Sequence, residues 1–301
     1  MPGWGAMLPA DRVLREMTDL GLTATEYGSP GFLPDSPGAV KDLLARHEMS
    51  LIGGFTPLVL HERSLRREAI AEVRRVAEFL SSAGATEFVS CPVMDADWSE
   101  PRPLEASERT NMFEMFAIID EICGEMGMQQ VLHPHVQTVV ETTDEVQRVL
   151  DGCDVNWCLD TGHFAIGGAD PVAFAKEAAS RVGHVHLKDV NMDLAPGLLR
   201  REMSIMDGVQ RGLFPSLGQG DVDIAAVIVE LEQAGYQGWY VIEQDTAITG
   251  AMPAPDTGPV TAVSESMRYL RESVAPLVGE PAKGARSAAG AAAPSRAGGA
   301  R

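Results

Sequence analysis

Two patterns of apolar residues alternate along the chain. Short runs rich in β-branched and aromatic residues predict eight strands, at residues 2–6, 24–28, 50–55, 87–91, 129–135, 156–160, 183–188 and 238–243. Amphipathic segments predict helices at residues 11–21, 36–48, 65–84, 108–127, 143–152, 170–181, 223–235 and 263–277. Predicted cap positions support these helices: N-caps at Asp11, Ser36, Asp170 and Asp223, and stop signals at Gly84, Gly127, Gly152 and Gly235. This alternation predicts a parallel sheet covered by helices.

Eight such units predict a single (β/α)8 TIM barrel, a fold that typically takes about 250 residues. An open dinucleotide-binding sheet is disfavoured because the chain has no GxGxxG or GxxxxGK[ST] loop. We expect residues 1–278 to form one catalytic domain. The first strand starts at the first residues of the sequence, so either this strand is short or upstream sequence is missing.

Two segments fall outside the repeating pattern. Residues 279–301 contain Ala, Gly, Pro, Ser and Arg without large apolar side chains, which predicts a disordered tail. Residues 192–220 form a long connection with Met203, Met206, Leu213 and Phe214 as apolar anchors. Connections of this length commonly serve as lids or partner surfaces.

Charge and composition exclude several classes of protein. The 301-residue chain has a formal net charge of −19, which disfavours binding to nucleic acid or to anionic membranes. No apolar run is long enough to span a bilayer, and the N-terminus lacks the pattern of a signal peptide, so we expect a cytoplasmic protein. The four cysteines have no CxxC spacing and are expected to be reduced and mostly buried.

Candidate chemistry gathers where four consecutive predicted strands end. These ends carry His133 and His135, Asp160 and His163, His184, His186 and Lys188, and finally Glu243 and Asp245. In a βα barrel the carboxyl ends of the strands meet at one rim, so these groups are expected to converge. A mixed set of imidazoles and carboxylates suits Mn²⁺, Co²⁺, Zn²⁺ or Fe²⁺ better than Ca²⁺, which prefers oxygen ligands.

Each residue taken alone has a simpler explanation. A single histidine at a strand end is more often a hydrogen-bonded core residue, Asp160 could cap the next turn, and Lys188 could pair with Asp189 or a rim carboxylate. Glu243 is harder to explain in this way, because its apolar strand would bury an unpaired carboxylate. Their joint placement on successive strands therefore favours a metal site.

Several motifs together resemble one family. Residues 131–142 (VLHPHVQTVVET), 157–163 (WCLDTGH), 184–190 (HVHLKDV) and 235–245 (GYQGWYVIEQD) resemble the xylose-isomerase-like TIM-barrel superfamily of sugar isomerases, epimerases and dehydratases. Within it, the chain is most similar to the inosose (2-keto-myo-inositol) dehydratase family, a resemblance that residues 24–34 and 208–224 share. By this resemblance the metal ligands are Asp160, His186 and Glu243, with His133 as the fourth. Many superfamily members have a glutamate at the position of His133, so a histidine there favours dehydration over epimerisation.

The resemblance implies a metal-dependent dehydratase of a cyclic keto-polyol, with a role in inositol catabolism. The reaction would proceed by α-proton abstraction, a metal-stabilised enolate and loss of a β-hydroxyl, with Mn²⁺ or Co²⁺ as the first choice of ion and Zn²⁺, Fe²⁺ or Mg²⁺ as others. Our hypothesis assigns proton abstraction to His135 or Glu141. Lys188 and His163 would polarise the carbonyl or deliver the proton. The polyol pocket would be lined by Glu26, Trp4 and His163.

Other functions remain open at this point. One is a keto-sugar isomerase or epimerase, and another is a keto-glycoside (C-glycoside) lyase that works beside a small companion subunit. A nuclease of the same superfamily would need a basic groove, which the charge of −19 disfavours. A binding barrel without activity would not be expected to keep this rim of histidines and carboxylates. The sequence does not separate a monomer from a homo-oligomer.

Overall fold

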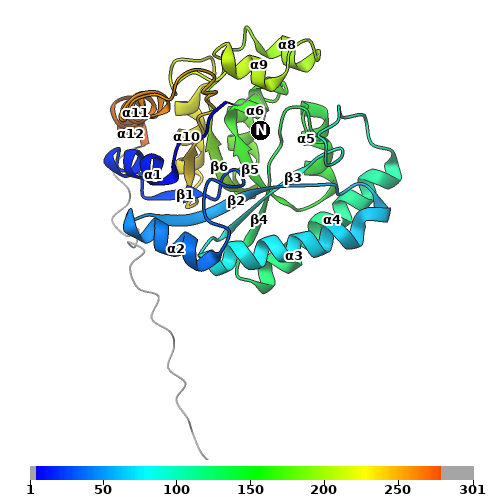
Figure 1. Ribbon diagram of the computed structural model, residues 1–301. Helices are drawn as coiled ribbons and strands as arrows, with labels where there is room; N and C mark the ends of the chain where they lie inside the picture. Colours follow the sequence, from blue (N-terminus) through cyan, green and yellow to red (C-terminus); the bar gives the residue numbers. More distant parts are fainter. Residues whose placement is uncertain (1–4, 279–301) are drawn as a thin grey trace, which may run out of the picture.

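The computed structural model describes residues 5–278, which form a barrel of parallel strands surrounded by helices (Figure 1). Its seven strands pair in sequence order. They are β1 (Ala24–Glu26), β2 (Ser50–Leu58), β3 (Glu87–Pro92), β4 (Gln129–Leu132), β5 (Asn156–Asp160), β6 (Val182–Leu187) and β7 (Tyr240–Ile242). The predicted TIM-barrel fold is confirmed.

Helices cover the outside of the strands, as the amphipathic segments predict. They are α1 (Ala10–Asp19), α2 (Pro37–Arg46), α3 (Arg66–Ala83), α4 (Ala106–Glu125), α5 (Thr143–Gly152), α7 (Pro171–Glu177), α10 (Ile224–Gln233), α11 (Pro259–Tyr269) and α12 (Ala275–Val278). A π-helical turn at Leu270–Val274 joins α11 to α12, and two 3₁₀ turns lie at Arg63–Leu65 and Ala179–Arg181. Within residues 5–278, none of the helices is long and apolar enough to cross a membrane.

The predicted first strand is the main departure from the expected eight. Among the described residues it contributes a single parallel bridge between Gly5 and Ile248, where Ala6 N donates to Ile248 O at 2.9 Å. Gly5 has a φ of +79°, and a Cβ there would lie 1.9 Å from Ile248 O, so this close approach requires glycine. Trp4 and the predicted disordered tail at 279–301 lie outside the described residues.

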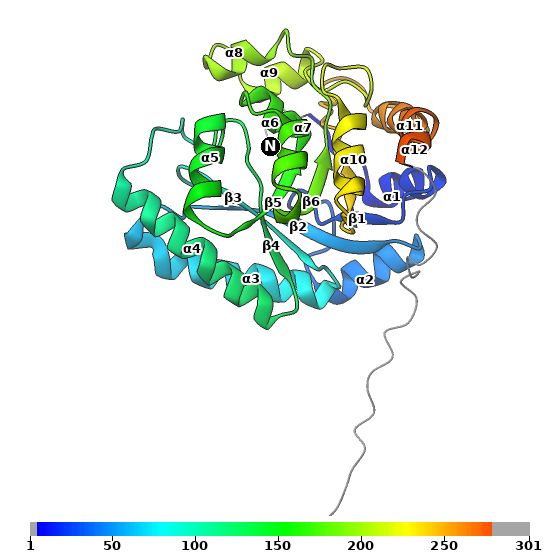
Figure 2. The ribbon, with the colours of Figure 1, turned by 180° about the vertical axis from the view of Figure 1, so that it is seen from behind.

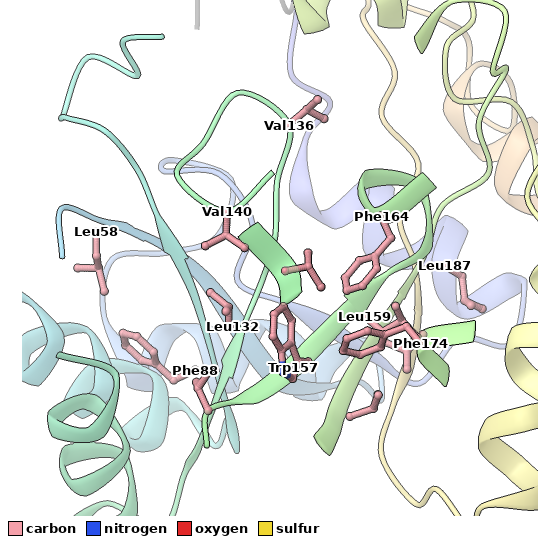
Figure 3. Packing of buried hydrophobic residues seen from close by; sticks show 14 of the residues in the cluster. Leu58, Phe88, Leu132, Val136, Val140, Trp157, Leu159, Phe164, Phe174 and Leu187 are labelled. Carbon is pink, nitrogen blue, oxygen red and sulfur yellow. The ribbon is translucent and has the colours of Figure 1, made fainter. Parts of the chain in front are cut away.

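Strand residues alternate between an outer and an inner environment. Outward side chains pack under the helices, where Trp157, Phe164 and Phe174 meet edge to face with ring centroids 4.7–6.1 Å apart (Figure 3). Val89, Val131 and Cys158 form a separate buried cluster of inward side chains. Because the side-chain period of a strand is two, the inward positions that follow Val131 and Cys158 belong to His133 and Asp160.

Most of the predicted helix ends are confirmed. Ser36, Asp170 and Asp223 accept hydrogen bonds from first-turn backbone amides, and Gly84, Gly127 and Gly235 have φ between +71° and +103°. Two were wrong. Asp11 lies inside α1, which begins at Ala10 after Pro9. Gly152 is the last residue of α5, and a Cβ there would meet the Phe113 ring at 2.2 Å, so packing requires this glycine.

The long connection after β6 folds over one end of the barrel. It contains α8 (Ala195–Leu199) and α9 (Ile205–Gln210), which lie beyond α6 (Thr161–Ile166) in both views (Figures 1 and 2). Since α6 directly follows β5, this is the end where the strands have their carboxyl termini. The predicted anchors Met203, Leu213 and Phe214 are buried, and Met206 is half-buried.

The four cysteines are free thiols, as predicted. Cys91, Cys123 and Cys158 are buried, and Cys153 is half-buried. Burial raises the pKa of the Cys123 thiol to about 12, which keeps it protonated. These thiols therefore act as small apolar side chains.

Candidate metal centre

Four side chains from four neighbouring strands converge inside the barrel mouth. His133 follows β4, Asp160 ends β5, His186 lies on β6 and Glu243 follows β7. One ligand atom from each lies within 4.8 Å of the others. The structure thus brings together all four residues that the sequence suggested as metal ligands.

Several polar atoms of this set are buried without a hydrogen-bond partner. Within residues 5–278, Asp160 Oδ2, His186 Nδ1 and Glu243 Oε2 form no hydrogen bond. His186 Nδ1 lies 2.7 Å from Glu243 Oε2, and Asp160 Oδ2 lies 3.5 Å from His133 Nε2. Burying unpaired polar atoms is costly unless a cation binds them. Their convergence therefore fits a divalent metal ion.

Asp160 has two roles. Its Oδ1 accepts a hydrogen bond from His163 N at 2.7 Å and caps α6, while Oδ2 remains free for the centre. The simple explanation as a turn cap is therefore correct for one oxygen only. Capping also fixes the orientation of the carboxylate, because the backbone amide holds its other oxygen.

Glu26 positions two of the histidines from β1. Its Oε1 accepts hydrogen bonds from Nε2 of His184 at 2.8 Å and of His186 at 3.0 Å. Burial opposes ionisation, but the two imidazoles hold the pKa of Glu26 well below its usual range. With its Nε2 proton directed at Glu26, His186 turns Nδ1 toward Glu243. This carboxylate–histidine pair resembles those that orient metal-binding histidines. The predicted contact of Glu26 with substrate stays a prediction.

We predict that Glu26→Gln weakens metal binding. The neutral amide is a poorer acceptor for the two imidazole protons, and loss of such a partner typically weakens a metal site about 10- to 100-fold. Calorimetric titration with Zn²⁺ measures the effect. Glu87→Gln is the matched control, because Glu87 is another buried glutamate that hydrogen-bonds Gln129 instead. Equal Zn²⁺ affinity in wild type and Glu26→Gln would refute the positioning role.

Lys188 is fully buried among carboxylates. Its Nζ lies 2.8 Å from Glu243 Oε1, 3.1 Å from Asp245 Oδ2 and 3.7 Å from Asp160 Oδ2. Burial disfavours the ammonium, but these carboxylates outweigh it and raise the pKa of Lys188 above its ordinary value. Lys188 therefore carries a positive charge beside the centre at neutral pH.

Asp245 was among the groups expected at the rim, but the sequence assigned it no role; the structure places it beside the Lys188 ammonium. The suggested Lys188–Asp189 pair is not formed. Instead, Asp189 accepts hydrogen bonds from backbone amides of Gly218, Gly220 and Val222 and anchors the loop before α10.

His135 and His163 lie against each other beside Lys188. Their ring centroids are 3.9 Å apart, and His163 Nε2 lies 3.2 Å from Lys188 Nζ. Burial, with the nearby His133 and Lys188, lowers the pKa of His135 to about 3. Burial and the charge of neighbouring groups also lower the pKa of His163 well below its usual value. Both imidazoles are therefore neutral at neutral pH.

Glu141 has both oxygens occupied. They accept hydrogen bonds from the Arg201 guanidinium at 2.9 and 2.6 Å, and Oε1 also accepts one from Gln137 N. A carboxylate held this way is a poor proton acceptor, which leaves His135 and His163 as candidates for the base. Glu141 instead ties the segment containing α8 and α9 to the loop after β4.

We predict that Arg201→Ala loosens this segment. The ion pair is partly buried and is worth about 1 kcal/mol, so local opening should become roughly fivefold more frequent. Limited proteolysis should then cut residues 192–220 faster, while the melting temperature changes little. Arg200→Ala is the control, because exposed Arg200 pairs with Glu202 inside the same segment. Equal cleavage rates for the two variants would argue against the anchoring role of Arg201.

Phe214 brings this segment into contact with the site. Lys188 Nζ lies 4.8 Å from the centroid of the Phe214 ring, and the ring meets His163 edge to face at 6.2 Å. Gln244 Nε2 donates a hydrogen bond to Phe214 O at 2.9 Å. The sequence marked Phe214 only as an apolar anchor, but the ring also covers the buried ammonium.

The barrel and its convergent imidazoles and carboxylates define the protein as a TIM-barrel enzyme with a candidate metal centre. The chain belongs to the xylose isomerase-like TIM barrel family, which it matches over residues 14–273. The family resemblance noted in the sequence is thereby confirmed.

Individual relatives agree with this assignment. The chain is 32% identical over 262 residues to an inosose dehydratase of Geobacillus kaustophilus, covering 82% of this chain and 84% of the relative. Its fold is similar to the probable 3-DHS dehydratase AsbF of Bacillus anthracis, with a TM-score of 0.69, 14% identity and coverage of 90% and 96%. It is also similar to the IOLI protein with a binding zinc atom, with a TM-score of 0.64, 16% identity and coverage of 88% and 91%. The protein is thus a sugar-modifying TIM-barrel enzyme.

Proposed function

We propose that the protein is a divalent-metal-dependent dehydratase of a cyclic keto-polyol such as 2-keto-myo-inositol. The observation that carries this proposal is the convergent set of His133, Asp160, His186 and Glu243, with buried atoms that lack hydrogen-bond partners. The relative named inosose dehydratase supports the choice of substrate.

The donor set fits a transition metal. Two imidazoles and two carboxylates suit Mn²⁺, Co²⁺, Zn²⁺ or Fe²⁺, and the similar IOLI structure holds zinc. When bound, such an ion supplies Lewis-acid polarisation of the substrate ketone. His133, Asp160, His186 and Glu243 would hold it.

The chain's own residues would carry the protons. Neutral His135 or His163 accepts the proton from the carbon next to the ketone, and the electrons of that C–H bond form the new double bond. The β-hydroxyl leaves as its C–O bond breaks, and Lys188 or His163 supplies the proton that completes a water molecule. The contact of 3.2 Å between Lys188 Nζ and His163 Nε2 supports exchange of a proton between these two residues.

A metal-supplemented assay tests the proposal. We expect chelator-treated protein to be inactive on 2-keto-myo-inositol, and activity to return with Mn²⁺, Co²⁺ or Zn²⁺. The product should have lost the mass of one water and should absorb in the ultraviolet. An isomerase or epimerase would leave the mass unchanged, and a keto-glycoside lyase would release a second molecule from a glycoside. Absence of water loss with every metal would overturn the proposal.

A further inference from the structure

Two aromatic side chains remain open inside the barrel mouth. Phe55 on β2 and Trp98 in the loop before α4 are each 37% exposed, and their rings stack with centroids 6.3 Å apart and planes at 23°. Phe55 is paired in register with Val89, which belongs to the inner cluster of the barrel. Paired residues of parallel strands point to the same face, so Phe55 faces inward and yet is not covered.

The stacked pair lies directly beside the candidate centre. The Phe55 ring meets His133 edge to face at 5.4 Å, and the Trp98 ring meets His135 in the same way at 5.6 Å. A candidate metal ligand and a candidate base each contact one ring of the pair. A substrate bound between these histidines would therefore lie against Phe55 and Trp98.

The backbone at Trp98 is strained. Its φ is +58°, a left-handed conformation that is unfavourable for a bulky side chain. The turn is held by Asp95, whose Oδ1 accepts hydrogen bonds from the amides of Asp97 and Ser99. Strain of this kind concentrates at ligand-binding sites, where the surrounding structure holds a side chain in a required place.

We propose that Phe55 and Trp98 form a platform for the C–H face of a six-membered ring whose hydroxyls are equatorial. Aromatic faces carry partial negative charge and attract the positive edge of C–H groups. A ring with only equatorial hydroxyls presents such a face, whereas an axial hydroxyl on the docked face would point into the aromatic surface and lose its hydration. Both 2-keto-myo-inositol and a keto-glucoside have this shape. The inference rests on the proposed function and adds the stereochemical class of its substrate.

The test compares Trp98→Gly and Phe55→Leu with wild type. We expect each variant to raise the KM for 2-keto-myo-inositol about tenfold with a much smaller change in kcat, because a platform contributes mainly to binding. Against an inosose epimer with one axial hydroxyl, the variants should lose most of the wild-type discrimination. Assays on 2-keto-myo-inositol and on a 3-keto-glucoside show which of these two kinds of substrate the enzyme converts.

Two further measurements control for effects of the substitutions on folding. Glycine tolerates the left-handed backbone at position 98, which offsets part of the packing lost with the ring, so Trp98→Gly should still unfold cooperatively at a temperature close to that of wild type. Trp239→Ala is the matched control, because Trp239 is 40% exposed and precedes β7 at the opposite end of the strand from the site. Its KM should equal that of wild type.

A binding measurement distinguishes failure of the platform proposal from failure of the proposed function. Calorimetry on Zn²⁺-supplemented protein with scyllo-inositol, which has no ketone and cannot react, should give about tenfold weaker binding in Trp98→Gly. Unchanged affinity and an unchanged KM in both aromatic variants would overturn the platform. Loss of scyllo-inositol affinity in a protein that dehydrates no inosose would instead refute only the proposed reaction.

Discussion

Replacing His186 by alanine, or Glu243 by glutamine, is expected to abolish turnover and to remove the bound metal. Each change deletes one of two imidazoles or one of two carboxylates whose ligand atoms lie within 4.8 Å of the others. Lewis-acid activation is worth several kcal/mol, so kcat/KM should fall at least about a thousandfold. Metal content of the purified variants and their rate of water loss from 2-keto-myo-inositol are the measurements.

Two variants away from the mouth serve as controls. His47→Ala removes an imidazole that pairs with Asp11 on the surface, and Glu232→Gln changes a carboxylate that binds the Tyr240 hydroxyl. Both should retain wild-type turnover and metal content. Wild-type metal content and turnover in either His186→Ala or Glu243→Gln would show that the centre is assigned to the wrong residues.

Replacing Lys188 by methionine is expected to cause the largest loss of stability. The variant would leave Glu243, Asp245 and Asp160 close together without their shared ammonium. Removing one partner of a buried ion pair typically costs about 3–5 kcal/mol. Denaturant unfolding of metal-free protein at neutral pH measures this loss. Added Zn²⁺ should recover part of it in the variant, because the metal supplies positive charge at the same place.

The loss of stability in Lys188→Met should become smaller as the pH falls. Burial opposes ionisation of Glu243, but Lys188 and His186 hold its pKa well below the usual value, so this stabilisation is lost as pH falls through the depressed pKa. In Lys188→Met the ammonium no longer lowers this pKa, so we expect the carboxyl to take up a proton at a higher pH than in wild type, which relieves the repulsion. The difference between variant and wild type should therefore shrink on acidification. Lys176→Met, on the exposed face of α7, is the control and should unfold like wild type at every pH.

A variant Lys188→Met that is as stable as wild type at neutral pH, without metal, would contradict the charge balance described here. It would mean that groups other than Lys188 compensate the negative charge of the three carboxylates. The same variant also tests the proposed proton transfer, since methionine cannot supply a proton to the leaving hydroxyl. We expect its kcat to fall about a hundredfold or more, even when Zn²⁺ restores stability.

The strand pattern alone was sufficient to predict which side chains share the interior. Val131 and His133, Cys158 and Asp160, and His184 and His186 are each two residues apart, so each pair faces the same side of its strand. Since parallel strands end at the same rim of a barrel, the predicted fold already implied that these side chains meet. This is why the sequence alone could suggest four side chains that the structure then brings together.

Contacts between loops could not be found in this way. Glu141 and Arg201 are 60 residues apart. Phe55 lies on β2 and Trp98 lies in the loop before α4, so no sequence spacing relates the two rings. Glu141 was therefore suggested as a base, although a guanidinium occupies it, and the aromatic pair was overlooked. Likewise, the bridge between Gly5 and Ile248 joins two segments far apart in the chain, which no local pattern could predict.

The sequence by itself determined the barrel, its inward positions and the residues of the candidate centre, because periodicity along a strand decides which face each side chain occupies. The tertiary structure decided how those residues are used: which oxygen of Asp160 stays free, which carboxylates surround Lys188 and which rings stand beside His133 and His135. These features depend on packing between segments distant in the chain. A local sequence pattern does not specify that packing, because many different partner segments would satisfy the periodicity of each segment equally well.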